Sequence, residues 1–270
     1  MKPKLIATDV DGTLINSSSE LTDRTLAALK EAQLQGIKVI LATGRMCCCA
    51  SIFAKQIGIT DPCVFYNGAM IMNPATEEIY FRQGINAELT ARVLAYYREK
   101  GWYLQKYVND RLYVVDSSDE RTQFYVAITK ADAISLGEKF WTEHTAVTKL
   151  LACSKKGETC TPMLEETKRI FGSELYVVSS WERVVEMGNP DVNKAHSVAR
   201  AAAMLGIKRE DVACFGDSSN DNEMLRWAGL GVAMGNAKEE TKQAADAITD
   251  TNDNDGLAQF VENLLSQNRR

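Results

Sequence analysis

The sequence predicts an α/β protein, with a doubly wound Rossmann-like parallel-sheet core and an inserted α+β cap domain. Short apolar runs alternate with amphipathic helical patterns in both terminal parts of the chain, which is typical of βαβ units with right-handed crossovers. Between them, this alternation gives way to helices followed by hairpin patterns. The core is therefore expected at residues 1–83 and 189–270, and the insert at residues 84–188.

The first strand is predicted at Leu5–Ala7, because three consecutive apolar residues suit a strand that is buried on both faces. Asp9 and Asp11 follow, and alternation places both carboxylates on one side if the strand continues. Like charges so close repel each other, so a cationic group is expected near them. Gly12 and Thr13 then turn the backbone. Because ligand sites of open parallel sheets lie at the carboxyl ends of strands, this pair is a candidate site.

Two more strands are predicted in the N-terminal part of the core. A helix with Thr22 as its N-cap precedes the strand Val39–Ala42, which ends at Thr43-Gly44-Arg45. The third strand, Cys63–Tyr66, ends at Asn67-Gly68, a strong turn signal. Its position at a strand end allows Asn67 to face the candidate site.

The insert is predicted to contain a helix and a β-hairpin twice over, with a further strand between the repeats. This pattern predicts a pseudo-repeated α+β unit with an antiparallel sheet. The second helix is expected to have Thr161 as its N-cap and Pro162 at its first position. The predicted strands are Trp102–Val108, Arg111–Val115, Val147–Cys153, Leu175–Val178 and Arg183–Met187.

The alternating pattern resumes after the insert. Asn193-Lys194 begins a helix, and the strand Val212–Phe215 ends at a polar segment, Gly216–Asp221. Short strands at Leu230–Met234 and Ala247–Thr249 and a C-terminal helix complete the core.

Composition excludes several classes of function. The net charge is −5 and no basic tract is present, which argues against nucleic acid or an anionic membrane as partner. No apolar stretch approaches membrane-spanning length, and no signal-peptide pattern precedes the first strand. Seven cysteines without a CxxC motif indicate free thiols in a reducing cytosol. We therefore expect a cytoplasmic protein, a monomer or weak homodimer.

Cys47-Cys48-Cys49 is predicted to open a helix. Adjacent residues on a helix do not face one another, and no histidine or further cysteine follows at metal-ligand spacing. These residues are interpreted as small, half-buried helix residues rather than as a redox or metal centre.

Four short motifs occur in order, each at a strand end or a helix start. They are Asp9-Val10-Asp11-Gly12-Thr13, Thr43-Gly44, Lys194, and Gly216-Asp217 with Asn220-Asp221. Together they resemble the haloacid dehalogenase superfamily, in the branch that forms an aspartyl-phosphate with magnesium. The late lysine and the long insert are similar to the Cof-type phosphatases, whose insert is a cap domain.

This resemblance implies a Mg²⁺-dependent phosphatase acting on small phosphate monoesters, such as a sugar phosphate or a phosphorylated cofactor. Asp9 would be the nucleophile and Asp11 the general acid and base. Asp9 and Asp217 would bind the metal through side-chain oxygens, and Asp11 through its backbone carbonyl. The phosphate would be bound by Thr43, Gly44, Lys194 and Asn220, with Asp221 and Asn67 in supporting positions.

Two other functions remain open at this stage. A phosphomutase of the same superfamily would return the phosphoryl group to a second hydroxyl. A non-catalytic nucleotide-binding or sensor protein on a doubly wound fold is disfavoured, because no dinucleotide fingerprint or P-loop follows the first strand. The family often has glycine after the lysine, whereas this chain has Ala195. His196, one residue further along the helix, is not interpreted as a catalytic base, because Asp11 already has that role.

Overall fold

The structure, a computed structural model, describes residues 3–143 and 145–266. The chain divides into two compact units, each described here by itself. The first comprises Met1–Gly44, Ala50–Phe81 and Asn193–Arg270, and the second comprises Arg45–Cys49 and Arg82–Val192. The chain therefore passes from one unit to the other near residues 45, 50, 82 and 193.

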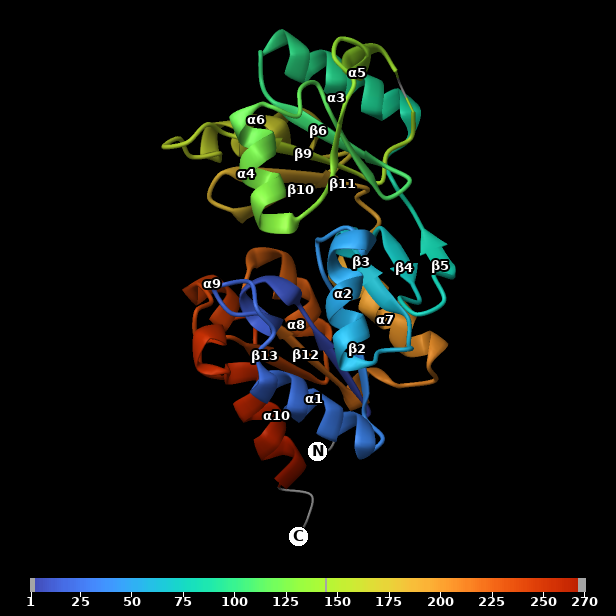
Figure 1. The fold of residues 1–270 in the computed structure, drawn as a ribbon, viewed down its shortest axis with the longest axis vertical. Coiled ribbons are helices and arrows are strands. Elements are labelled where there is room, and N and C mark those ends of the chain that lie inside the picture. The colour runs from blue at the N-terminus through green and yellow to red at the C-terminus, as the bar shows by residue number, and fades with distance from the viewer. Residues whose placement is uncertain (1–2, 144, 267–270) are drawn as a thin grey trace. The chain divides into compact units, whose positions relative to one another are not determined.

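The first unit is built on a parallel sheet of five strands, in the order β14-β13-β12-β1-β2 (Figure 1). The central strand β1 pairs with β2 on one side and with β12 on the other, and Ile6 lies between Val39 and Ala213. The strands are β1 (Leu5–Thr8), β2 (Lys38–Leu41), β12 (Val212–Gly216), β13 (Leu230–Ala233) and β14 (Ala247–Ile248).

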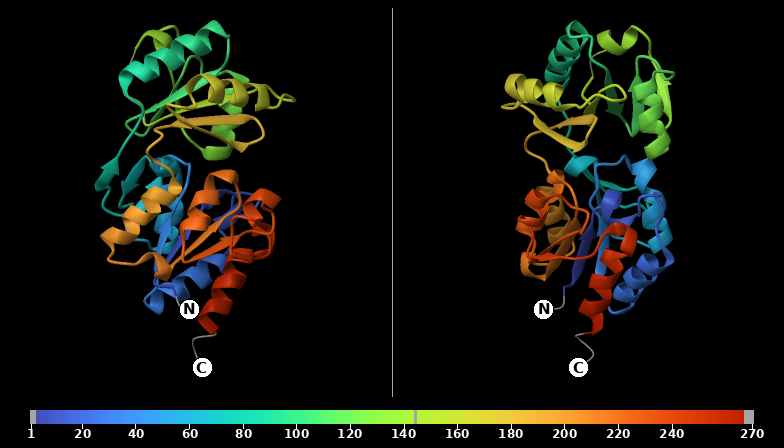
Figure 2. Two further views of the ribbon diagram at one scale, coloured as in Figure 1. Left: turned by 180° about the vertical axis from the view of Figure 1, so that it is seen from behind. Right: turned by 90° about the vertical axis from the view of Figure 1, so that its left-hand side faces the viewer.

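Helices cover both faces of this sheet, as expected for a doubly wound fold (Figure 2). On one face α1 (Asp23–Leu34) packs beside α10 (Gly256–Ser266), and on the other α7 (Lys194–Met204) packs beside α8 (Asn222–Trp227). Thr22 caps α1 as predicted, because its hydroxyl accepts the Thr25 N–H at 3.2 Å. The first unit also contains the short α9 (Glu239–Lys242) and most of α2 (Cys47–Ile57), whose first three residues belong to the second unit.

The first strand ends before Asp9, so it does not continue through Asp9 and Asp11. β1 stops at Thr8, and Val10–Leu14 forms one wide π-type turn. Gly12 makes this turn possible, because its φ of +73° lies in the left-handed region. The prediction that strand alternation orients Asp9 and Asp11 is therefore wrong, and the turn positions them instead.

A small sheet of three strands, β3-β4-β5, extends the first unit. Its members are β3 (Cys63–Phe65), β4 (Met70–Met72) and β5 (Ile79–Arg82), of which only β3 is predicted from the sequence. A parallel bridge joins Ala42 to Val64, so β3 lies beside the carboxyl end of β2. The β3–β4 turn contains Asn67, whose φ is +54°.

The second unit has a six-stranded sheet in the order β10-β11-β9-β6-β7-β8. Both predicted hairpins form, and β9 joins them by pairing with one strand of each. One feature differs from the prediction, because β8 pairs with β7 in parallel, so the sheet is not wholly antiparallel. The strands are β6 (Leu104–Val108), β7 (Arg111–Val114), β8 (Ala133–Ser135), β9 (Lys149–Cys153), β10 (Tyr176–Trp181) and β11 (Val184–Gly188).

One face of this sheet packs against α3 (Ala87–Glu99), α5 (Lys139–Thr142) and α6 (Thr161–Phe171). Val93, Phe140 and Leu150 belong to the apolar core between them. The N-cap of α6 is Cys160, and Pro162 is its second residue. The predicted start is thus one residue too late, which is within the usual variation of helix ends.

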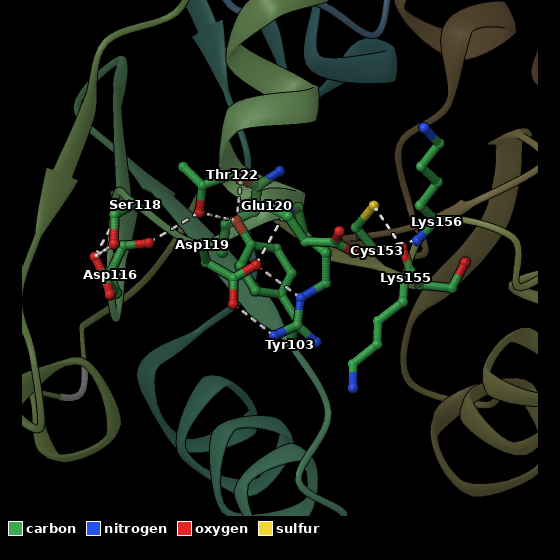
Figure 3. Close-up of polar contacts among 12 residues, drawn as sticks. Tyr103, Asp116, Ser118, Asp119, Glu120, Thr122, Cys153, Lys155 and Lys156 are labelled. Atoms are coloured by element: carbon green, nitrogen blue, oxygen red, sulfur yellow. Dashed lines mark hydrogen bonds and ion pairs between the residues drawn. The ribbon is translucent and has the colours of Figure 1, made fainter.

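The helix α4 (Glu120–Thr129), which the sequence analysis missed, contacts the opposite face of the second sheet. The hydroxyls of Tyr103 and Thr122 lie 2.7 Å apart, and the rings of Tyr107 and Tyr125 meet edge to face at 6.4 Å. Figure 3 shows the polar contacts around Tyr103, Thr122 and Asp119 that fix the start of this helix. None of the helices in the described ranges is long and apolar enough to cross a membrane.

Candidate active site

A buried ion-pair cluster lies at the carboxyl end of β1. The Lys194 ammonium is 2.7 Å from Asp9 Oδ1 and 2.7 Å from Asp221 Oδ1. The three side chains are only 1%, 7% and 0% exposed, respectively. The cationic group that the sequence leads us to expect near the first carboxylates is therefore the ammonium of Lys194, which lies 185 positions after Asp9 in the chain.

The start of α7 fixes Lys194 in this position. Asn193 is the N-cap of the helix, and its side-chain oxygen accepts the His196 N–H at 2.8 Å. Ser197 donates to the Gly68 carbonyl at 2.7 Å, which ties the helix to the turn after β3. The side chain of His196 itself is exposed.

Asp217 and Asp221 enter the cluster from the loop after β12. One oxygen of Asp221 accepts the N–H groups of Asp217 and Ser218, each at 3.1 Å, and the other accepts from Lys194. Both oxygens of Asp221 are thus used by protein donors, which suits a residue that positions others. The loop is tightly packed, because a Cβ on Gly216 would lie 2.5 Å from the Cβ of Asp221.

Asp9, Asp217 and Asp221 form a candidate metal centre. Their ligand atoms lie within 4.8 Å of one another, and within the described ranges no other group of three acidic, histidine or cysteine side chains meets this condition. Carboxylate oxygens suit a hard divalent cation. The backbone after Asp11 also approaches closely, because a Cβ on Gly12 would lie 2.4 Å from Asp217 Oδ2. The residues present therefore fit the metal that the sequence leads us to expect.

The charge of the cluster favours a cation. Three carboxylates face one ammonium, so the fully ionised cluster has a net charge of −2 in a buried position. Burial raises the pKa of Asp9 well above its usual range and that of Asp217 to about 7, with Asp221 adding to both shifts. Burial opposes the charge of Lys194, but Asp221 and Asp9 outweigh it and raise the pKa of the ammonium. A divalent cation would offset the excess charge.

The polar residues after β2 and β3 meet in a second group. Asn67 Oδ1 accepts from Asn220 Nδ2 at 3.0 Å, and the Asn67 N–H donates to the Thr43 carbonyl at 3.0 Å. A Cβ on Gly44 would lie 2.8 Å from Asn67 Oδ1, so the Asn67 side chain would have to shift to admit any other residue there. The buried Asn220 Oδ1 accepts from none of the described residues. Its Nδ2 group has a second hydrogen besides the one given to Asn67, so it can also donate to a phosphate.

The structure adds residues that the sequence analysis did not select. The Thr13 and Ser218 hydroxyls donate to Asp217, at 3.3 and 3.2 Å, and orient its carboxylate. Asn236 donates to the Gly12 carbonyl at 2.9 Å and supports the turn after Asp9. Thr13 lies within the first motif, and Asn236 follows the end of β13, so position at a strand end is the signal that would have found both.

Comparison with known proteins agrees with this arrangement. The profile of the haloacid dehalogenase-like hydrolases matches residues 6–261. The chain belongs to this family. Because curated relatives across the full length of the chain are named phosphatases, it is an enzyme of the phosphatase branch of the superfamily.

Three matches illustrate the relationship. Phosphatase YwpJ of Bacillus subtilis is 30% identical, and the alignment covers 97% of this chain and 100% of that protein. A second B. subtilis protein, 5-amino-6-(5-phospho-D-ribitylamino)uracil phosphatase YcsE, is 30% identical over 97% of this chain and 96% of its own length. The crystal structure of a haloacid dehalogenase-like hydrolase from Bacteroides thetaiotaomicron has a TM-score of 0.87 and 31% identity, with 97% and 100% coverage.

Proposed function

We propose that this enzyme is a Mg²⁺-dependent phosphatase that hydrolyses small phosphate monoesters through an aspartyl-phosphate on Asp9. The observation that carries the proposal is the buried cluster of Asp9, Asp217 and Asp221 around Lys194. Asp9, Asp217 and the Asp11 carbonyl would hold the metal. Bound magnesium supplies positive charge that offsets the repulsion between a phosphate dianion and a carboxylate.

In the first step Asp9 attacks phosphorus in line with the leaving oxygen, and the P–O bond to that oxygen breaks. Lys194 and the loop of Thr43 and Gly44 hold the equatorial oxygens as charge develops on them. The position of Lys194 against Asp9 Oδ1, at 2.7 Å, supports this role, because a phosphoryl group transferred to Asp9 would remain next to the ammonium.

Asp11 gives its proton to the leaving alkoxide and then takes one from the water that attacks the aspartyl-phosphate. It lies two residues from the nucleophile in the turn that Gly12 allows, and its side chain is only partly buried, so solvent can reach it. A partly exposed carboxylate can exchange protons between the two steps.

Asp11→Asn is expected to lower kcat by on the order of 10²–10⁴-fold, the usual range for general acid–base catalysis. The loss should be smaller for p-nitrophenyl phosphate than for an alkyl phosphate, because a good leaving group needs no proton. Steady-state kinetics with both esters measures the difference. Equal losses on the two esters would contradict this role for Asp11.

Magnesium affinity is expected to rise about tenfold between pH 6 and pH 8, because a metal must displace the proton from Asp217, whose pKa burial raises to about 7. Without metal, the same raised pKa means that folded protein binds a proton that unfolded protein releases. The free energy of unfolding of the metal-free protein should therefore fall as the pH rises from about 4 to about 7.

Titration calorimetry at the two pH values and urea denaturation in EDTA measure these effects. Asp217→Asn removes the titrating group and serves as the matched variant, in which metal binding is weaker and both pH dependences are reduced. Magnesium affinity that is equal at pH 6 and pH 8 would exclude Asp217 as a titrating ligand.

We further propose that residues 84–188 act as a cap that selects the substrate. Every residue with a proposed chemical role lies outside this range. The proposed substrate class is a sugar phosphate or a phosphorylated cofactor, and the phosphoribitylamino group in the name of YcsE supports it.

Exchange of residues 84–188 for the corresponding segment of phosphatase YwpJ is expected to transfer the ranking of substrates while magnesium-dependent hydrolysis persists. A screen of phosphorylated metabolites compares both parents with the chimera, and circular dichroism checks its fold. A folded, active chimera that kept the original ranking would place specificity in the core.

The low net charge and free thiols support a cytoplasmic protein without nucleic-acid or membrane partners.

A further inference from the structure

The three consecutive cysteines at the start of α2 have no part in the proposed reaction. Because neighbouring residues on a helix normally point apart, the sequence predicts no contact between them. The structure nevertheless brings the Sγ atoms of Cys48 and Cys49 to 3.7 Å, close enough for a thiol to donate to its neighbour. All seven cysteines are free thiols, so this pair is reduced.

These two thiols differ from the other cysteines, Cys48 in its exposure and Cys49 in its pKa. Cys48 is the exposed one of the seven, whereas the remaining six are buried. Burial raises the pKa of Cys63 to about 12 and that of Cys153 to about 11, which keeps these thiols protonated and unreactive. The hydrogen bond from Cys48, assisted by Arg45, instead lowers the pKa of Cys49.

We propose that Cys48 and Cys49 form a reversible redox pair, in which hydrogen peroxide oxidises Cys49 and Cys48 then closes a disulfide between the two. The Cys49 thiolate attacks one peroxide oxygen, the O–O bond breaks, and sulfenic acid and hydroxide form. Cys48 sulfur then attacks Cys49 sulfur, an S–S bond forms and the S–O bond breaks. The departing hydroxide takes the Cys48 proton and leaves as water.

A disulfide between neighbours does not fit the helix. Consecutive Cα atoms are about 3.8 Å apart, whereas disulfides usually join Cα atoms about 4.4–6.8 Å apart. The small ring that such a disulfide closes includes the peptide between the two residues and restrains their torsion angles. We therefore expect its formation to distort the first turn of α2, whose Cys47 and Cys48 N–H groups donate to the Asp110 carboxylate at 3.0 and 2.9 Å. A strained disulfide is also easily reduced, which makes the change reversible.

This first turn of α2 lies next in sequence to a proposed phosphate-binding loop. Thr43 and Gly44 end three residues before α2 begins at Cys47, with Arg45 and Met46 between them. Displacement of this loop is expected to lower kcat/KM by on the order of 10²-fold, the scale of loss for a group misplaced by about 1 Å. This consequence rests on the proposed function, but formation of the disulfide does not.

Mass spectrometry of the full-length protein tests the pair independently of activity. Trypsin cuts after Arg45 and Lys55, which places Cys47, Cys48 and Cys49 in one peptide without other cysteines. After brief peroxide treatment and alkylation, we expect only one of the three cysteines of this peptide to be alkylated, and the peptide mass to be two hydrogens lower because of the disulfide. Reduction with dithiothreitol before alkylation should restore all three alkylated cysteines. Cys48→Ser should prevent the disulfide and leave a sulfenic acid on Cys49 that dimedone labels, and Cys49→Ser should prevent both.

Cys47→Ser is the matched control and should behave as the wild type. The assignment would be overturned if all three cysteines of this peptide were still alkylated in the peroxide-treated wild type, or if a disulfide still formed in Cys48→Ser. The phosphatase assay on the same samples separates the two proposals. Inactive reduced protein would count against the proposed function alone, whereas full kcat/KM in the disulfide-linked protein would overturn the coupling to the Thr43-Gly44 loop.

Discussion

Asp9→Asn is expected to lower kcat by more than about 10⁴-fold, the order of loss seen when a covalent nucleophile is removed. An amide cannot attack phosphorus, and the residual Asp11 carboxylate lies in the turn rather than at the end of β1. The fold should persist, because asparagine keeps the shape of the side chain and the Asp9 N–H remains bonded to the Phe215 carbonyl at 3.0 Å.

The measurement is steady-state hydrolysis of p-nitrophenyl phosphate, with circular dichroism and thermal unfolding as checks of the fold. Asp132→Asn, on the exposed surface of the insert, makes the same chemical change away from the cluster and should retain full activity. Turnover within tenfold of the wild type in a folded Asp9→Asn protein would remove Asp9 from the mechanism.

Lys194→Met is expected to have a large effect on both stability and activity. Methionine fills much of the same space but leaves the buried Asp9 and Asp221 carboxylates without their shared ammonium, 2.7 Å from each. Removal of one partner from a buried ion pair costs about 3–5 kcal/mol. Loss of a charged group that faces the phosphoryl oxygens should also lower kcat by on the order of 10²–10³-fold.

Urea denaturation in EDTA at pH 8 and pH 5 measures the loss of stability, and Lys168→Met on the exposed side of α6 provides the control. The cost should be smaller at pH 5, because burial raises the pKa of Asp9 and lets it take up a proton when the ammonium is absent. A free energy of unfolding equal to that of Lys168→Met at pH 8 would contradict the buried ion pair.

The close approach of the side chains in the buried cluster could be anticipated from the sequence, because each of them follows a strand or begins a helix. Asp9, Thr43 and Asp217 follow apolar runs, and parallel strands bring their carboxyl ends to one edge. Lys194 was recognisable from the N-cap before it and from its place in the order of motifs. These are local signals, and the parallel fold combines them.

Features that depend on distant contacts were not predictable in this way. The pairing of Asn67 with Asn220 spans 153 positions, and neither neighbourhood indicates which amide the other meets. The helix α4 was missed because it has a weak apolar stripe, and only its packing against Tyr103 and Tyr107 shows which face is buried. The contact between Cys48 and Cys49 contradicts the average geometry of a helix and depends on side-chain orientation at its first turn.

The phosphoryl group on Asp9 is the most direct test of the account. Asp11→Asn protein with Mg²⁺ is mixed with ³²P-labelled p-nitrophenyl phosphate and quenched in acid, because this variant should form the intermediate from a good leaving group and hydrolyse it slowly. Borohydride then reduces the aspartyl-phosphate to homoserine, which marks its position in the tryptic peptide Leu5–Arg24. We expect ³²P on the quenched protein and, after reduction has expelled the phosphate, homoserine at residue 9, both absent when EDTA replaces Mg²⁺. Release of nitrophenol at the catalysed rate with no ³²P on the quenched protein, or with homoserine at another residue, would contradict the proposed mechanism.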